Sequence, residues 1–269
     1  MKRRLRTFMI VANLVGLFPT LIAGCGTSFD AVVATAHVGQ AIQRHRATFE
    51  QTYVTCLEGV ALGAVDADLC EKVDAARVNI DAGLGALVAY ATSLRAVATG
   101  RDADMKDSVA AAAEALPVAN IQKSSEEIGS AVGDLVAFIT RTLRREALSE
   151  IVKDADGSVQ GLATAVESAV ASWQAVVASM PQDALRLLSK SQDTPERLLL
   201  ASVAGRLRAQ AALLEEAMVS VRAFAAAHAT LAKSSDTLGA SETVSDVLDA
   251  ALEVSSAVNE LKAPPEEAP

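Results

Sequence analysis

Residues 68–100 read DLCEKVDAARVNIDAGLGALVAYATSLRAVATG, and this stretch decides the fold. Its apolar residues recur at steps of three and four, which is the period of one face of an α-helix. They are Leu69, Val73, Ala76, Ile80, Leu84, Leu87, Ala91, Leu94 and Val97. Asp68 is expected to cap the start of the helix, and Gly100 stands where a glycine commonly ends one. A helix of this length spans about 45 Å, so the stretch predicts a long element of a helical bundle.

The composition extends this prediction to the whole chain. Hydrophobic residues make up 51% of the 269 residues, but only 3% are aromatic, and alanine, valine and leucine dominate. Alanine is the best helix former, and small side chains allow helices to approach closely. Seven prolines are present, three of them among the last six residues, so long helices are permitted. We predict an all-α fold, an elongated antiparallel bundle of about five to seven helices.

Further helices are expected on both sides of this stretch. They cover approximately residues 29–58, 105–116, 125–151, 159–180, 182–190, 194–233 and 241–261. A break or kink is predicted at residues 153–158, because aspartate, glycine and serine there are poor helix formers. Pro181 is expected either to end its helix or to lie within one curved path. Residues 25–262 are predicted to form one domain, and residues 263–269 a disordered acidic tail.

The amino-terminal residues have a different character from the rest of the chain. The basic residues Lys2, Arg3, Arg4 and Arg6 precede an apolar run at residues 8–22. This run is interrupted and too short for a comfortable membrane span. Small residues then lead to a cysteine in the order Leu21, Ile22, Ala23, Gly24, Cys25. A basic start, an apolar run and small residues in that order predict a secretory signal.

The segment that ends at Cys25 resembles the lipobox of bacterial lipoproteins, which has a branched apolar residue, two small residues and a cysteine. The resemblance implies that residues 1–24 are a signal peptide and that the Cys25 thiol receives a diacylglyceryl group. It also implies cleavage before Cys25 and acylation of the new amino terminus, with palmitate as a typical chain. Gly26, where an aspartate would signal inner-membrane retention, favours the outer membrane. In a Gram-positive host the anchor would lie in the cell membrane instead.

The remaining chain resembles uncharacterised all-helical lipoproteins of Gram-negative envelopes in the texture of its sequence, and this resemblance transfers no functional residue. It implies a body that faces the periplasm. Loss of the four basic residues before Cys25 would take the formal net charge from -9 to -13. A chain this acidic is not expected to bind nucleic acid. The expected partners are the membrane, through acylated Cys25, and another envelope protein.

Two further cysteines, Cys56 and Cys70, are predicted to form a disulfide. Two thiols in an exported chain are more often paired than free. Cys56 falls at the end of one predicted helix and Cys70 in the first turn of the next, so an antiparallel hairpin brings them together. The alternative is that each is a separate buried thiol.

No residue is predicted to be catalytic or to bind a metal or cofactor. Of the three histidines, His37 and His45 lie eight positions apart, which is a poor spacing for joint chelation. Either of them with His228 could in principle hold haem between helices, but interfacial packing is the favoured interpretation. Asp154, Asp156 and Ser158 lack the glycine and glutamate positions of a calcium loop. Trp173, Tyr90, Phe138 and Phe224 are expected to be core anchors.

These observations favour a non-enzymatic protein with a structural or protein-interaction role at the envelope. One alternative is a helical bundle that carries an apolar ligand, either a lipid or haem. A second is an enzyme whose site the sequence does not reveal; no nucleophile elbow, catalytic serine–lysine box or phosphate-binding glycine loop is present.

Overall fold

The computed structural model describes residues 29–100, 128, 130–135, 148–238 and 240–262. The helices in these ranges are α2 (Asp30–Gln40), α3 (Gln43–Ala61), α4 (Ala67–Ala98), α8 (Leu148–Leu188), α9 (Thr194–Lys233) and α10 (Ser241–Lys262). A short 3-10 helix, η2 (Ser235–Thr237), joins α9 to α10, and residues 128 and 130–135 are also helical. The described ranges contain no strand, which confirms the predicted all-α class.

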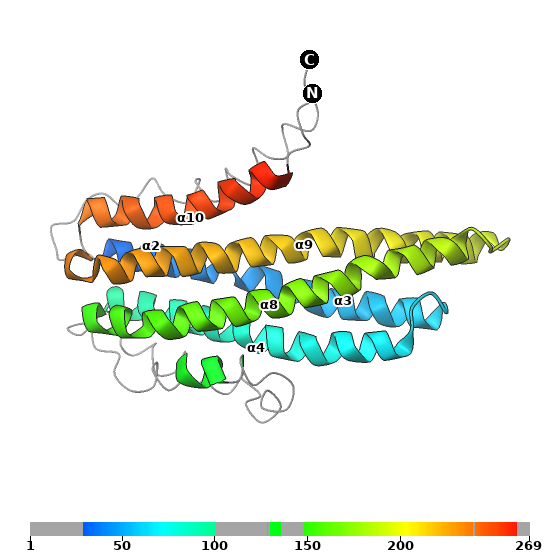
Figure 1. Cartoon of the computed structure of the whole chain (residues 1–269), viewed down its shortest axis with the longest axis horizontal. Helices are drawn as coiled ribbons and strands as arrows, with labels where there is room; N and C mark the ends of the chain where they lie inside the picture. The colour runs from blue at the N-terminus through cyan, green and yellow to red at the C-terminus, as the bar shows by residue number, and fades with distance from the viewer. Residues whose placement is uncertain (1–28, 101–127, 129, 136–147, 239, 263–269) are drawn as a thin grey trace, which may run out of the picture.

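The helices pack side by side as an elongated bundle (Figure 1). α8 and α9 form a long antiparallel hairpin, and α4 packs against α8. α2 and α3 follow one another along the bundle, and both contact α4 and α9. α10 covers α9 and α2. The turn between α8 and α9 lies at one end of the bundle, and α2 begins at the opposite end.

Helix α4 confirms the prediction made for residues 68–100. Leu84 and Leu87 are fully buried, and Gly100 has a φ of 72°, the left-handed conformation of a glycine that ends a helix. The capping residue is Asp66 rather than Asp68, because the Asp66 carboxylate accepts the Asp68 N–H at 3.0 Å. By length and composition α4 could span a membrane, but most of its apolar window is buried inside the bundle. Packing against the other helices accounts for its apolar character.

Two glycines mark places where helices touch most closely. A Cβ atom on Gly39 of α2 would lie 2.5 Å from the Ala91 Cβ atom and 2.7 Å from the Phe224 ring. A Cβ atom on Gly83 of α4 would meet the Val166 side chain. These contacts fit a core of small side chains, in which stability comes from close helix approach.

The first predicted helix is divided in two. The backbone tightens at Ala41 and Ile42, where the Ile42 N–H donates to the Gly39 carbonyl three residues back. The tight turn directly follows Gly39, at the closest approach of α2 to its neighbours. Residues 29–58 are therefore two consecutive helices rather than one.

The predicted break at residues 153–158 is wrong, because α8 runs without interruption from Leu148 to Leu188. Val152, Ala155 and Val159 are buried on one face of it. Their burial outweighs the low helix propensity of the neighbouring aspartates and glycine. Pro181 lies inside the same helix and is itself buried, so of the two expected outcomes the continuous path is the observed one.

Some apolar residues in the predicted helices 29–58, 194–233 and 241–261 are exposed, among them Leu199 at 55%, Val54 at 45% and Leu252 at 44%. In α9 the adjacent Leu200 is buried instead. Consecutive apolar residues fit two helical registers equally well, and packing selects one of them. Asp193, not Thr194, is the residue before α9. The predicted helix at 105–116, residue Phe138 and the tail at 263–269 lie outside the described residues.

Candidate functional site

A buried polar triad joins three helices towards the end of the bundle where α8 begins and where α4 and α9 end. The Tyr90 hydroxyl of α4 lies 2.8 Å from Nε2 of His228 in α9. His228 Nδ1 lies 3.0 Å from Oδ1 of Asp156 in α8. Tyr90 and His228 are fully buried, and the Asp156 side chain is 31% exposed. The triad thus leads from the core to the surface of α8.

The partners fix which atoms of the triad donate. An ionised carboxylate can only accept, so His228 Nδ1 carries a proton and donates to Asp156. Nε2, the other ring nitrogen, then accepts the Tyr90 O–H. This hydrogen bond from His228 is the main cause that lowers the pKa of the Asp156 carboxyl. Burial raises the pKa of the Tyr90 phenol well above its usual value, and the Asp156 charge adds to this, so the phenol remains a donor.

The triad has the residue types of an activated nucleophile, a base and an orienting carboxylate. A substrate, however, has to reach the nucleophile, and neither Tyr90 nor His228 is exposed. The Phe224 ring also packs against the His228 ring, with centroids 6.1 Å apart. The arrangement is suited to holding α4, α8 and α9 together, not to catalysis at the surface.

A second buried histidine, His45, ties α3 to α9. Its Nε2 lies 2.9 Å from the Ser220 hydroxyl, which itself donates to the Glu216 carbonyl at 3.1 Å. His45 Nε2 therefore donates to Ser220. Burial, and next the charge of Arg44, lower the pKa of His45 to about 4. Burial, and next the charge of Arg95, also lower the pKa of His37.

In the described residues, His228 is not free to serve the haem site that was considered as an alternative. Both ring nitrogens of His228 are engaged, by Tyr90 and by Asp156, so neither has a free lone pair for iron. Across the described part of the chain, no group of three or more His, Cys, Asp or Glu residues could hold a metal ion.

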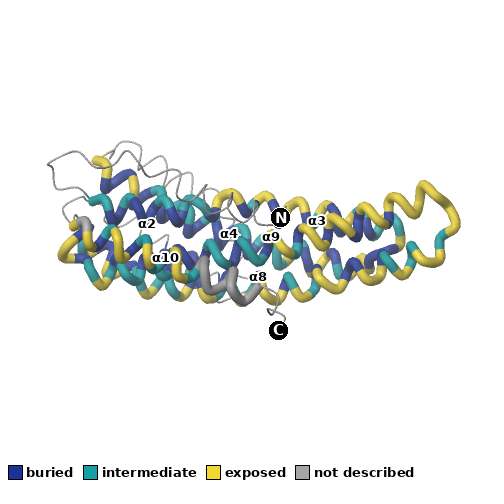
Figure 2. The backbone as a smooth tube through the Cα atoms, turned by 90° about the horizontal axis from the view of Figure 1, so that it is seen from above, coloured by how far each residue is buried: buried dark blue, intermediate teal, exposed yellow. Residues whose placement is uncertain are grey.

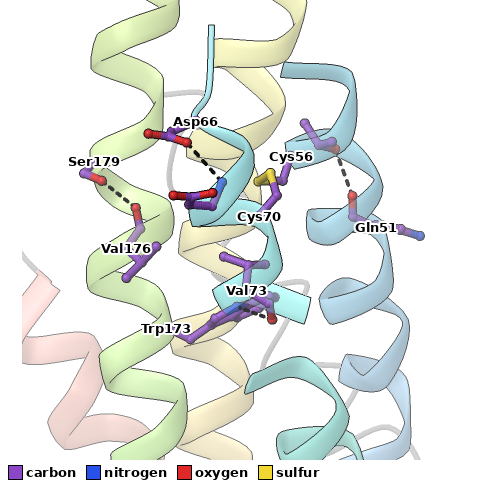
Figure 3. Close-up of a disulfide and its surroundings, with 10 residues drawn as sticks. Gln51, Cys56, Asp66, Cys70, Val73, Trp173, Val176 and Ser179 are labelled. Carbon is purple, nitrogen blue, oxygen red and sulfur yellow. Dashed lines mark hydrogen bonds between the residues drawn. A yellow bond between two sulfur atoms is a disulfide. The ribbon is translucent and has the colours of Figure 1, made fainter. Parts of the chain in front are cut away.

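A disulfide joins Cys56 of α3 to Cys70 in the first turn of α4 (Figure 3), with the Cα atoms 5.9 Å apart. This confirms the predicted pairing. Close by, the Trp173 indole N–H of α8 donates to the Val73 carbonyl at 3.1 Å. The Trp173 ring also stacks on Phe49 of α3 at 5.0 Å, so its place as a core anchor is confirmed. Cys25, the predicted lipidation site, lies outside the described residues.

The surface beside Trp173 is hollowed between α4 and α8. We call this hollow the Trp173 groove and define it by Val73, Ala76, Ile128, Ala169, Trp173 and Val176. Its volume is about 400 Å³, and Lys72 and Ser172 lie at its polar edge. Trp173 is only 2% exposed and forms the floor rather than a wall. The groove is mainly apolar, with few polar groups.

A second hollow, of about 370 Å³, lies between α3 and α4 and is charged. Arg46 binds the Asp81 carboxylate through two hydrogen bonds of 2.7 Å. Arg77 pairs with Asp74 and Glu50. Because each of these two arginines is paired with a carboxylate, the hollow offers no unpaired cation to a ligand. It is best understood as a brace between the two helices.

No family model, curated protein or solved structure matches this chain. Functional inference therefore depends on the sequence and on the geometry. Besides the Trp173 groove, the strongest surface feature is at the start of α9, where Leu198 is 68% and Leu199 55% exposed. These are the two most exposed large apolar side chains of the described residues. Figure 2 shows the backbone at this end of the bundle as mostly exposed.

Sequence reasoning missed the triad. It gave His228 an interfacial place and assigned Asp156 to a helix break, and it did not connect the two. The two residues lie 72 positions apart and meet only through packing of α8 against α9. One local signal existed: Gln160, four residues after Asp156, donates to it at 3.1 Å, as spacing on a continuous helix allows.

Proposed function

We propose that this chain is a lipid-anchored protein of the cell envelope that acts by binding another protein and catalyses no reaction. The anchor is Cys25, in the segment that resembles a lipobox. The Cys56–Cys70 disulfide supports an exported location, because such bonds form and persist in oxidising compartments. In a Gram-negative host, the anchor lies in the outer membrane and the bundle faces the periplasm.

The observation that carries the interaction role is the pair Leu198 and Leu199. The exposure of adjacent leucine side chains to water is unfavourable. Exposed apolar side chains of this kind are commonly buried in protein interfaces. They lie in the first turns of α9, next to the turn from α8, at the end of the bundle. A partner that covers them would remove this apolar area from water.

The position of Leu198 and Leu199 relative to the anchor at Cys25 fits an interaction role. α9 has 40 residues and is about 60 Å long. Cys25 precedes Asp30, the first residue of α2, by five positions, which can span at most about 18 Å. α2 begins at the end of the bundle opposite to the leucines. The bundle therefore acts as a rigid spacer that holds its binding end away from the membrane.

The alternative of a bundle that encloses an apolar ligand has less support. Gly39 and Gly83 allow the described helices to touch closely, and His228 has no nitrogen left for haem iron. Both hollows described above lie at the surface. The interaction role requires no opening of the bundle.

Site-specific photo-crosslinking in the native host tests the proposal. A photoreactive amino acid at position 198 is expected to form a covalent adduct with a single envelope protein, and Leu199→Ser is expected to reduce its yield. The matched control is position 252, where Leu252 of α10 is also exposed but lies on another helix. Absence of an adduct at 198, or the same adducts at 198 and 252, contradicts the proposed interaction.

A further inference from the structure

The Trp173 groove has the features of a binding site for a hydrocarbon chain, which goes beyond the proposed interaction role and does not depend on it. Its accessible walls come from Ala76 of α4 and from Ala169 and Val176 of α8. Val73, Ile128 and the Trp173 ring are almost fully buried and form the floor. Sites for small ligands are hollows of this kind, mainly apolar with a few placed polar groups.

The volume favours a narrow occupant. An α-helix about 10 Å across would fill about 400 Å³ in roughly one turn of 5.4 Å, so the groove could take only a single turn of a partner helix. Helix-binding grooves must instead accept side chains from several successive turns. A hydrocarbon chain is much narrower than a helix and runs further in the same volume.

The charge at the edge of the groove indicates the head group. Lys72 is exposed and makes no ion pair with any residue that the structure describes. It lies four residues before Ala76, so the two share one face of α4. An ammonium group at the edge of an apolar hollow is complementary to a carboxylate at the end of an alkyl chain. The Ser172 hydroxyl, also exposed at this edge, donates its proton to the Ser168 carbonyl at 3.0 Å, so at the groove it can only accept.

We propose that the Trp173 groove binds a free fatty-acid anion, with its alkyl chain over Trp173 between α4 and α8 and its carboxylate at Lys72. The apolar walls supply the affinity by removing the chain from water. Lys72 selects an anionic head group over a neutral one of the same length.

Trp173 makes the proposal directly measurable, because it is the only tryptophan of the chain. Bromine quenches indole fluorescence only at close contact, so 12-bromododecanoate is the probe. The full chain carrying Cys25→Ala is used, so that no covalent acyl chain competes for the groove. We expect saturable quenching of Trp173 fluorescence by the probe.

Two pairs of variants locate the probe. Ala169→Leu, which fills the groove, is expected to weaken binding at least tenfold, whereas Ala171→Leu, at the exposed position two residues away, is expected to leave it unchanged. Lys72→Glu is expected to weaken binding of bromododecanoate at least tenfold but not of neutral 12-bromododecanol. Lys153→Glu, at an exposed lysine of α8, is the charge control. All variants keep residues 1–24, so binding of the probe there contributes equally.

Each contrary result overturns a stated part of the proposal. No quenching, or equal quenching in A169L and A171L, shows that the groove is not an alkyl-chain site. If K72E binds bromododecanoate as tightly as the parent chain does, and bromododecanol as tightly as well, Lys72 selects no anion. Thermal melts identify a variant that fails to fold, and the two surface lysine variants test the groove even if A169L does not fold.

Discussion

The buried His45 predicts a specific dependence of stability on pH. Its pKa is about 4 in the folded chain, against about 6.5 for an exposed histidine in the unfolded chain. Between these values the unfolded chain binds a proton that the folded chain does not. Stability is therefore fully present above pH 6.5, falls as the pH drops from 6.5 towards 4, and loses nothing further from His45 below pH 4.

The difference between 6.5 and about 4 corresponds to roughly 3 kcal/mol when the whole interval is crossed. At pH 5.0 the same two values give a loss of about 2 kcal/mol relative to pH 7.5. The physical cause is the 7% exposure of the His45 ring, which leaves little water to solvate a charged imidazolium. The nearby Arg44 charge adds to it.

Urea unfolding of the chain and of His45→Gln at pH 7.5, 6.0 and 5.0 measures this effect. Glutamine cannot titrate, and its amide can donate to Ser220 as the imidazole does. We expect H45Q to lose about 2 kcal/mol less than the parent chain between pH 7.5 and 5.0. His37→Gln is the control, because the half-buried His37 ring is expected to contribute less. Parallel stability curves for H45Q and the parent chain would refute the assignment.

Four further predictions follow from the core, the disulfide, the triad and the amino terminus. Leu87→Ala is expected to cost about 2–5 kcal/mol, because Leu87 is fully buried, and an unchanged thermal melt contradicts this. Replacing both Cys56 and Cys70 by alanine is expected to lower the free energy of unfolding by about 3 kcal/mol. Alkylation of two free thiols in the unreduced parent chain argues against the bond. Asp156→Asn is expected to cost about 1.5–3 kcal/mol by weakening a hydrogen bond to a charged acceptor, measured by urea unfolding at pH 7.5. Mass spectrometry of protein from the native host is expected to find a mature chain that starts at acylated Cys25; an unmodified Cys25 disproves the anchor.

The sequence was sufficient for the helices whose apolar residues follow a strict period. In α4 the positions from Val73 to Val97 recur at steps of three and four, and all but Ala76 among them are buried. The disulfide was also predictable, because a turn with few residues brings Cys56 and Cys70 to one end of a hairpin. Local patterns determine both features.

Features that depend on packing between distant segments were not predictable in the same way. Leu198, Leu199 and Leu200 are consecutive, and only contact with the rest of the bundle decides that Leu200 is the buried one. Asp156 was assigned to a helix break because it stands among poor helix formers, and its partner His228 belongs to another helix, 72 positions away. The Trp173 groove is lined by residues of α4, of α8 and by Ile128, a combination that no spacing within either helix reveals.

The central position of α9 has a consequence for how the chain is made. α9 contacts α2, α3, α8 and α10, yet it begins at residue 194 of 269. A ribosome or an export channel releases the amino-terminal end first, so α2 and α3 emerge before the helix that covers their apolar faces. Until then, these faces are open to aggregation. A holding chaperone would therefore have to act on the first half of the chain and release it once α9 arrives.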